Sequence, residues 1–104
     1  MAVAELFRAL GDPTRLEMVR RLSSGAPYTL TTVSYGLDIS RQGARKHLQV
    51  LADANIVTLK PQGRDTIVSL DREGLDAGKA FITQIERQWD QRLNNLEAYL
   101  TKGQ

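Results

Sequence analysis

The sequence predicts a mainly α-helical fold with a small β-hairpin wing, arranged as a winged helix-turn-helix. Residues 29–37 and 40–54 both place apolar side chains at helical spacing and are separated by a short break. Two runs rich in β-branched residues, 56–60 and 66–70, follow directly. The segment 61–65 between them contains proline and glycine, which is typical of a hairpin turn. Two short helices followed by a hairpin define a winged helix, and we expect about five helices in all.

The first predicted element is a short amphipathic helix over residues 2–10. Its apolar residues recur at helical spacing: Val3, Leu6, Phe7 and Leu10. Gly11 can end this helix, Asp12 can cap the next one, and Pro13 suits a first helical position. A second helix is therefore expected from Pro13 to about Ser23.

The second helix is expected to turn Leu16, Val19 and Leu22 toward the core. We expect Arg15, close to the helix start, to pair with a carboxylate inside the fold rather than to bind phosphate. Further along the chain, Tyr28 and Thr29 are expected to add a short strand beside the wing.

The helix predicted over 40–54 has a narrow apolar side. With successive residues about 100° apart, Ala44, Leu48 and Leu51 fall in one sector, and Ser40 can cap the helix. The opposite side carries long donor side chains. Arginine can pair bidentately with guanine and glutamine with adenine in the major groove, so this side suits the reading of base edges. The residues predicted to read bases are Arg41, Gln42, Arg45, Lys46 and Gln49.

A second set of residues is predicted to contact phosphates or to act from the wing, residues 60–65. These residues are Ser40, His47, Lys60, Arg64 and Thr31. His47 lies on the flank of the predicted reading helix, where a packing or phosphate-contacting role is favoured over metal ligation.

The charge distribution supports this assignment more than the net charge does. The chain carries only +2 overall. Residues 40–64 hold five basic residues against one acid, whereas residues 65–104 hold five against seven. The positive field is thus concentrated on the predicted reading surface, as phosphate attraction requires. The alternative interpretation is a solvated basic helix with no such role.

The last predicted helix, from Asp71 or Gly74 to Leu100, has an apolar stripe longer than one small domain needs. We expect the helices at 1–10 and 72–100 to join two identical subunits. The residues predicted at this interface are Leu6, Phe7, Phe81, Ile85, Trp89, Leu93 and Leu96. The alternative is a helix that folds back on its own core.

Composition excludes several function classes. A chain of 104 residues fits one domain, 1–104. The chain contains no cysteine, which excludes disulfides and thiolate metal sites. One histidine and no phosphate-binding glycine loop leave no convergent catalytic set, so we expect no enzyme and no cofactor. No apolar stretch is long enough for a membrane span, and we expect a cytoplasmic protein with no membrane partner.

The chain resembles the ArsR-type family of bacterial winged-helix regulators. Residues 6–16, LFRALGDPTRL, are similar to the family's opening signature, and 39–51 is similar to its recognition helix. The likeness extends from Val3 to Leu100. It implies a homodimer that binds an inverted repeat in double-stranded DNA and represses transcription. It also allows for an effector, either a small molecule between the long helices or a partner protein, or for none.

Three positions depart from the family pattern. Gly43 and Arg45 stand where alanine and serine are common, and a glycine inside a helix costs about 0.5 to 1 kcal/mol relative to alanine. Asp38 stands where glycine is usual, which requires a left-handed residue or a shifted turn. The family's cysteine metal sites cannot exist here, and the last helix lacks histidine, so we expect a branch that does not sense metal.

The predicted function is therefore sequence-specific DNA binding in transcription regulation. The helix at 40–54 would enter the major groove and the wing at 60–65 would contact the backbone. The alternative is a winged-helix module that regulates through a protein partner. Such a module would not need Gln42, Arg45 and Gln49 gathered on one exposed side.

Overall fold

The computed structural model describes residues 2–102, so Met1, Gly103 and Gln104 of the predicted domain 1–104 lie outside the described residues. It has five helices and three strands within that range. In chain order these are α1 (Ala2–Leu10), α2 (Pro13–Leu22), β1 (Tyr28–Thr29), α3 (Leu30–Val33), α4 (Arg41–Asp53), β2 (Val57–Gln62), β3 (Asp65–Leu70) and α5 (Arg72–Lys102). The predicted winged helix-turn-helix is confirmed.

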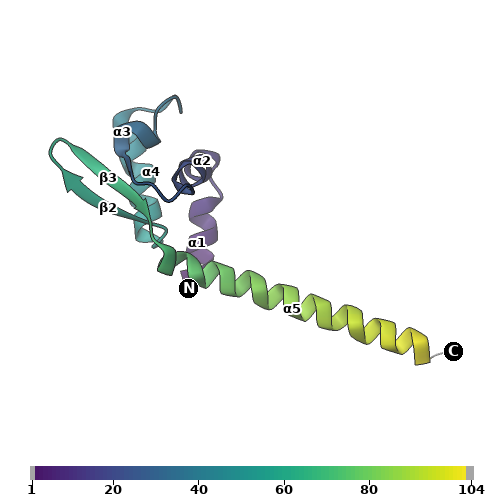
Figure 1. Cartoon of the computed structure of the whole chain (residues 1–104). Coiled ribbons are helices and arrows are strands. Elements are labelled where there is room, and N and C mark those ends of the chain that lie inside the picture. Colours follow the sequence, from purple (N-terminus) through teal and green to yellow (C-terminus); the bar gives the residue numbers. More distant parts are fainter. Residues whose placement is uncertain (1, 103–104) are drawn as a thin grey trace.

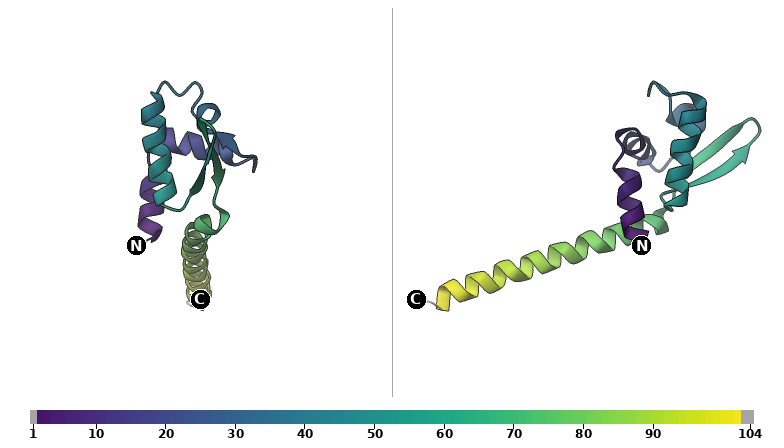
Figure 2. Two further views of the ribbon diagram at one scale, coloured as in Figure 1. Left: turned by 90° about the vertical axis from the view of Figure 1, so that its left-hand side faces the viewer. Right: turned by 180° about the vertical axis from the view of Figure 1, so that it is seen from behind.

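The molecule has a small body from which one long helix projects. Helices α1 to α4 and the sheet form the body, and α5 leaves it as a straight rod (Figure 1). The two further views agree (Figure 2). The principal extents of 70 × 25 × 25 Å reflect this shape. Every residue from 84 to 101 is exposed, so α5 does not fold back on its own core.

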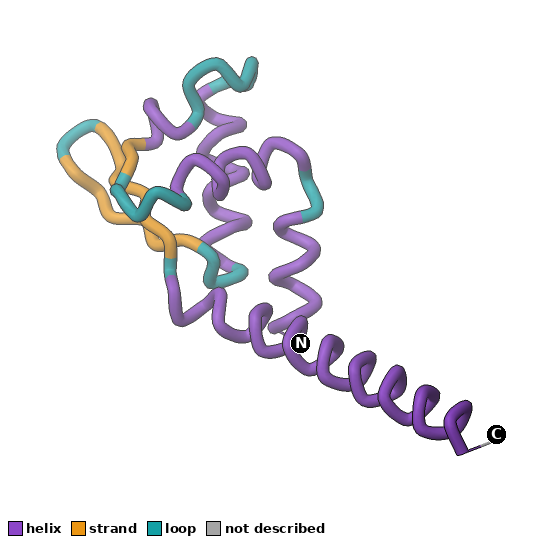
Figure 3. The backbone as a smooth tube through the Cα atoms, turned by 45° about the vertical axis from the view of Figure 1, so that its right-hand side comes forward, coloured by secondary structure: helices purple, strands orange, loops and turns teal. Residues whose placement is uncertain are grey.

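The three strands form one antiparallel sheet in the order β1, β3, β2. The strands β2 and β3 extend further toward the turn than predicted, so that Gln62 pairs with Asp65 and only two residues join them. Gly63, with φ of 60°, is the first of these two, a position where left-handed backbone favours glycine. This hairpin, β2 with β3, is the wing, seen as the orange projection in Figure 3. The predicted strand at Tyr28 and Thr29 is confirmed as its third member.

The core lies between the helices and the sheet. Its fully buried members include Met18 and Leu22 from α2, Leu48 and Leu51 from α4, and Val68 from β3, together with Leu30, Val33, Ala44 and Ile56. The prediction for Leu16 is wrong, because this side chain is 53% exposed and α2 buries Met18 in its place. Leu16 and Met18 lie on different sides of this short helix, and both sides show helical spacing of apolar residues. The side with Met18 is the one that packs against the core.

The turn of the helix-turn-helix is longer than predicted because α3 ends at Val33 rather than near Leu37. Ser34 closes the helix, and Gly36 then adopts a φ of 77°, which cannot continue a right-handed helix. The sequence left open whether Asp38 is left-handed or the turn is shifted. Asp38 has a φ of 56°, so it adopts the left-handed conformation. Ser40 caps α4 as predicted, accepting the backbone N–H of Gly43 at 2.9 Å.

Helix α5 is attached to the body at its start. The carboxylate of Asp71 accepts the backbone N–H of Gly74 at 3.1 Å and caps the helix. One turn later, Gly78 is buried against the side chain of Leu6 in α1. Leu6 is only 3% exposed in the single chain, so it belongs to the core and has little surface left for the predicted subunit interface. The other predicted interface residues lie on exposed surface, including Phe7, Phe81, Trp89 and Leu93.

Candidate nucleic-acid interface

Helix α4 divides into a buried and an exposed side along the line that the sequence predicted. Ala44, Leu48 and Leu51 are fully buried. The five predicted base-reading residues are all exposed: Arg41, Gln42, Arg45, Lys46 and Gln49. The helix is thus anchored by one side and offers the other to a ligand. An α-helix with such a side has the dimensions that the major groove of B-DNA admits.

The five exposed residues differ in what they already contact. The Nε2 group of Gln49 donates to Oδ1 of Asp53, one turn along the helix, at 2.9 Å. Arg41 is engaged by the wing. The side chains of Gln42, Arg45 and Lys46 are exposed and take no part in these two contacts.

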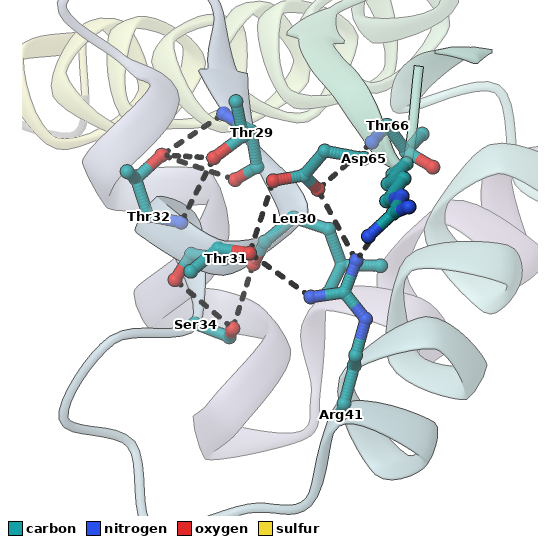
Figure 4. A network of polar contacts seen from close by, with 9 residues as sticks. Thr29, Leu30, Thr31, Thr32, Ser34, Arg41, Asp65 and Thr66 are labelled. Atoms are coloured by element: carbon teal, nitrogen blue, oxygen red, sulfur yellow. Dashed lines mark hydrogen bonds and ion pairs between the residues drawn. The ribbon is translucent and has the colours of Figure 1, made fainter. Parts of the chain in front are cut away.

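Arg41 joins the start of α4 to α3 and to the wing, as Figure 4 shows. Its Nη1 donates to Oγ1 of Thr31 at 3.0 Å, and its Nη2 donates to the carbonyl oxygen of Arg64 at 3.3 Å. The same Nη2 lies 3.5 Å from the carboxylate of Asp65. Thr31 in turn donates to Asp65 at 3.0 Å. Two predicted DNA contacts, Arg41 and Thr31, therefore contact each other and the wing in the free chain.

Asp65 is the acid that this network shares, and its pKa is held below the ordinary value. The backbone N–H of Thr66 contributes most, followed by the hydroxyl of Thr31 and the positive charge of Arg41. Asp65 is thus ionised at neutral pH. Sequence reasoning missed this residue, because Thr31, Arg41 and Asp65 are far apart in the chain and carry no local motif.

His47 lies on the flank of α4 that faces α1 and α2. Its Nδ1 is 3.1 Å from Nη1 of Arg15, while Nε of Arg15 donates to the carbonyl oxygen of Ala9 at 2.7 Å. The expected carboxylate partner of Arg15 is therefore wrong. The carbonyl groups at the end of α1 lack helical partners and are an alternative acceptor for a guanidinium group. The contact links the turn before α2 to the recognition helix.

The wing carries the remaining predicted phosphate contacts. Lys60 is exposed on β2, opposite Ile67, and Arg64 is exposed in the two-residue turn. Arg64 uses only its backbone carbonyl to hold Arg41, which leaves its guanidinium outside that contact. Both positive charges therefore lie along the hairpin that projects beside α4 (Figure 1).

Residues 2–102 lack two other features that would point to a different function. No group of three or more histidine, cysteine or acidic side chains is placed to hold a metal ion in that range. Within the same range, no helix has the length and apolar character needed to cross a membrane.

Comparison with known proteins identifies the class. Residues 10–60 match the model of a helix-turn-helix domain. The uncharacterized HTH-type transcriptional regulator YuzN of Bacillus subtilis is 38% identical over 67% of this chain and 83% of its own length. The HTH-type transcriptional regulator Rv2034 of Mycobacterium tuberculosis is 34% identical over 84% of this chain and 78% of its own. These relatives are transcriptional regulators, not enzymes.

Solved structures place the chain within a family. The crystal structure of an ArsR family transcriptional regulator, RHA00566, superposes with a TM-score of 0.78 at 28% identity, covering 86% of this chain and 91% of the other. A homodimeric winged helix-turn-helix domain of Mycobacterium bovis, Mb0332, shares the fold at 17% identity, with a TM-score of 0.64 over 84% and 80% of the two chains. The protein is a transcriptional regulator with a winged helix-turn-helix DNA-binding fold. It belongs to the ArsR family.

Proposed function

We propose that the protein is a homodimeric repressor that binds an inverted-repeat operator. Helix α4 enters the major groove, with Gln42, Arg45, Lys46 and Gln49 toward the bases. The wing contacts the adjoining backbone through Lys60 and Arg64. The observation that carries this proposal is the division of α4 into a fully buried side and an exposed side on which five long donor side chains gather.

The exposed apolar surface of α5 supports a dimer. Trp89 is 60% exposed and follows Phe81 and Ile85 along one stripe, which continues through Leu93 and Leu96. Phe7 of α1 adjoins this stripe, with its ring centroid 5.9 Å from that of Phe81. An apolar stripe of this length on a single chain is typical of a subunit interface. The homodimeric state of Mb0332, which has the same fold, is in line with this arrangement.

Two-fold symmetry determines the form of the operator. A dimer presents two copies of α4, so its site is an inverted repeat with half-sites about one helical turn apart. A protein bound over a promoter in this way excludes the polymerase, which is why we infer repression. If the protein responds to an effector, a small molecule between the long helices near Phe81 and Trp89 would release the DNA by changing how the subunits pack, and a partner protein would displace it.

The proposal is tested by selecting duplexes from a random pool with the purified protein, while its mass in solution is measured. We expect a palindrome to be enriched by a dimer. The double variant Gln42→Ala with Arg45→Ala should lose this binding and still fold and dimerise. The matched control is Gln84→Ala with Arg87→Ala, which removes the same residue types from the polar side of α5.

Two results would overturn the proposal. If the α4 double variant binds the selected duplex as well as the control variant does, α4 is not the reading surface. If no sequence is enriched from the pool, the result favours a ligand-dependent state or action through a protein partner, the alternative function considered from the sequence.

A further inference from the structure

The guanidinium of Arg41 is held within the chain at both terminal nitrogens, although its place on α4 suggests a base contact. Both terminal nitrogens have acceptors: Nη1 contacts Thr31 at 3.0 Å, and Nη2 contacts the carbonyl oxygen of Arg64 at 3.3 Å. Asp65 completes the arrangement, since it accepts from Thr31 at 3.0 Å and faces Arg41. The three side chains come from α3, α4 and β3 (Figure 4).

We propose that Arg41, Thr31 and Asp65 form a clamp that holds the wing at a set angle to α4, so that Arg41 is a positioning residue and not a reader of bases. This inference rests on the proposed function, in which α4 and the wing bind DNA together. Asp65, which the sequence did not single out, becomes a determinant of the DNA site.

The architecture of the wing explains why a clamp is needed at this point. The short strand β1 supports β3 only at Val68 and Ile67. Between Ile67 and the turn, the wing consists of β2 and β3 alone. A two-stranded hairpin without further support is only marginally stable. Arg41 and Thr31 contact the wing at Arg64 and Asp65, in this otherwise two-stranded part.

A fixed wing angle increases DNA affinity by preorganisation. Lys60 and Arg64 can reach phosphates in the same register as α4 only when the wing points in one direction. Fixing that direction before binding removes an ordering cost that the complex would otherwise bear. The clamp therefore acts on affinity without touching the DNA.

The clamp and simple electrostatics predict opposite changes in DNA affinity when the Asp65 carboxylate is removed. Asp65 places a negative charge beside the proposed DNA surface, so its removal alone should strengthen binding to a polyanion. If the carboxylate instead positions the wing, its removal should weaken specific binding. The sign of this one change separates the two roles.

The test compares Asp65→Asn with Asp38→Asn. The control removes the same charge from an exposed carboxylate just before α4, and asparagine tolerates the left-handed backbone there. We expect Asp65→Asn to bind the duplex selected by the wild-type protein more weakly by about three- to fivefold for each subunit, the scale of one exposed charge-assisted contact. Asp38→Asn should bind as tightly as wild type or more tightly.

A second comparison asks whether Arg41 and Asp65 act through each other. In an Arg41→Ala background, Asp65→Asn should weaken binding less than it does in wild type, because the contact between Arg41 and Asp65 is already lost and only the contact with Thr31 remains. If Arg41 reads a base instead, Asp65→Asn releases its guanidinium and strengthens binding in the wild-type background. That outcome overturns the proposal.

A third measurement tests the clamp without DNA. The chain contains no cysteine, so Gln62→Cys gives a single site for a nitroxide label on the wing. Electron paramagnetic resonance should report a more mobile label in Asp65→Asn and in Thr31→Val than in Asp38→Asn, with folding of each variant checked by circular dichroism. Unchanged mobility in both folded clamp variants overturns the proposal. If the wild-type protein selects no duplex, the proposed function fails, while the spin label still decides the clamp.

Discussion

Gly74, in the first turn of α5, packs directly against the backbone carbonyl oxygen of Asn55, which follows the end of α4. Asn55 has a φ of 61°, which turns the chain sharply after α4. Beside this contact, the backbone N–H of Asp71 donates to the carbonyl oxygen of Ile56 at 2.8 Å. The helix proposed to read DNA is thereby joined to the helix proposed to bind the second subunit.

Gly74→Ala should strongly destabilise the protein, because a methyl group at this position would overlap the carbonyl oxygen of Asn55. We expect the free energy of unfolding in urea to fall by about 3 kcal/mol, at the upper end for overpacking. The control is Gly43→Ala, where the added carbon lies 3.2 Å from Oγ of Ser40, the hydroxyl that caps α4. Because alanine favours helix while the close approach strains this cap, the variant should stay within about 1 kcal/mol of wild type in stability. Equal losses in both variants would contradict the prediction.

Asp12→Ala should remove the N-cap of α2. The carboxylate accepts the backbone N–H groups of Thr14 at 2.8 Å and Arg15 at 3.1 Å. We expect a loss of about 1 kcal/mol in the free energy of unfolding at neutral pH, the usual value of such a cap. Asp12→Asn retains an acceptor oxygen and should lose less.

The same residue predicts a pH dependence. The backbone N–H of Arg15 is the main cause that lowers the pKa of Asp12 below its ordinary 3.8. The stabilisation is therefore complete above about pH 4 and is lost as the pH falls through the lowered pKa. Unfolding measured from pH 6 to pH 2 should show a smaller loss of stability in Asp12→Asn than in wild type. Parallel pH profiles would show that this carboxylate has no such role.

The elements that the sequence predicted well are those with local signals. Asp12 and Ser40 cap the helices that follow them, and Gly63 occupies a turn that needs positive φ. Each signal acts over a few residues, so no knowledge of the fold is required to interpret it. The buried side of α4 follows from helical spacing alone, because its exposed side is entirely polar apart from Val50.

The features that the sequence could not supply depend on contacts between distant segments. Arg15 finds a carbonyl oxygen and His47 rather than a carboxylate, since the position of α4 decides its partners. Arg41 contacts Asp65 only because the fold places the start of β3 beside α3 and the start of α4. In α2, Leu16 and Met18 lie on competing stripes, and only the packed structure shows which one is buried.

Arg64→Ala in the wing should weaken DNA binding equally for all sequences. The side chain is exposed in the turn, while the backbone carbonyl that holds Arg41 is retained in the variant. Loss of one phosphate contact per subunit should reduce the salt dependence of log K by about 2 for a dimer. Titrations of the selected duplex and of a scrambled duplex at several salt concentrations measure this slope.

Arg45→Ala should behave differently from Arg64→Ala, because Arg45 is exposed on α4, the helix proposed to enter the major groove, and not on the wing. We expect a loss of about 1 to 3 kcal/mol for each half-site of the selected duplex and relaxed preference at one base position per half-site. A repeat of the selection with this variant identifies that position. If Arg45→Ala weakens binding to the selected and scrambled duplexes to the same degree, Arg45 contacts phosphate and does not read a base.

Trp89→Asp should separate the proposed dimer into single chains. The indole is 60% exposed in the single chain, so the body does not need it for its own core. A carboxylate buried at a subunit interface without a partner is strongly unfavourable, whereas the same group is solvated in a monomer. We therefore expect light scattering to give the mass of one chain for Trp89→Asp. Gln91→Asp introduces the same charge on the polar side of α5 and should leave the mass of the dimer unchanged. If Trp89→Asp also remains dimeric, the stripe on α5 is not the interface. If it is monomeric, its affinity for a single half-site measures what one α4 and one wing contribute without the second subunit.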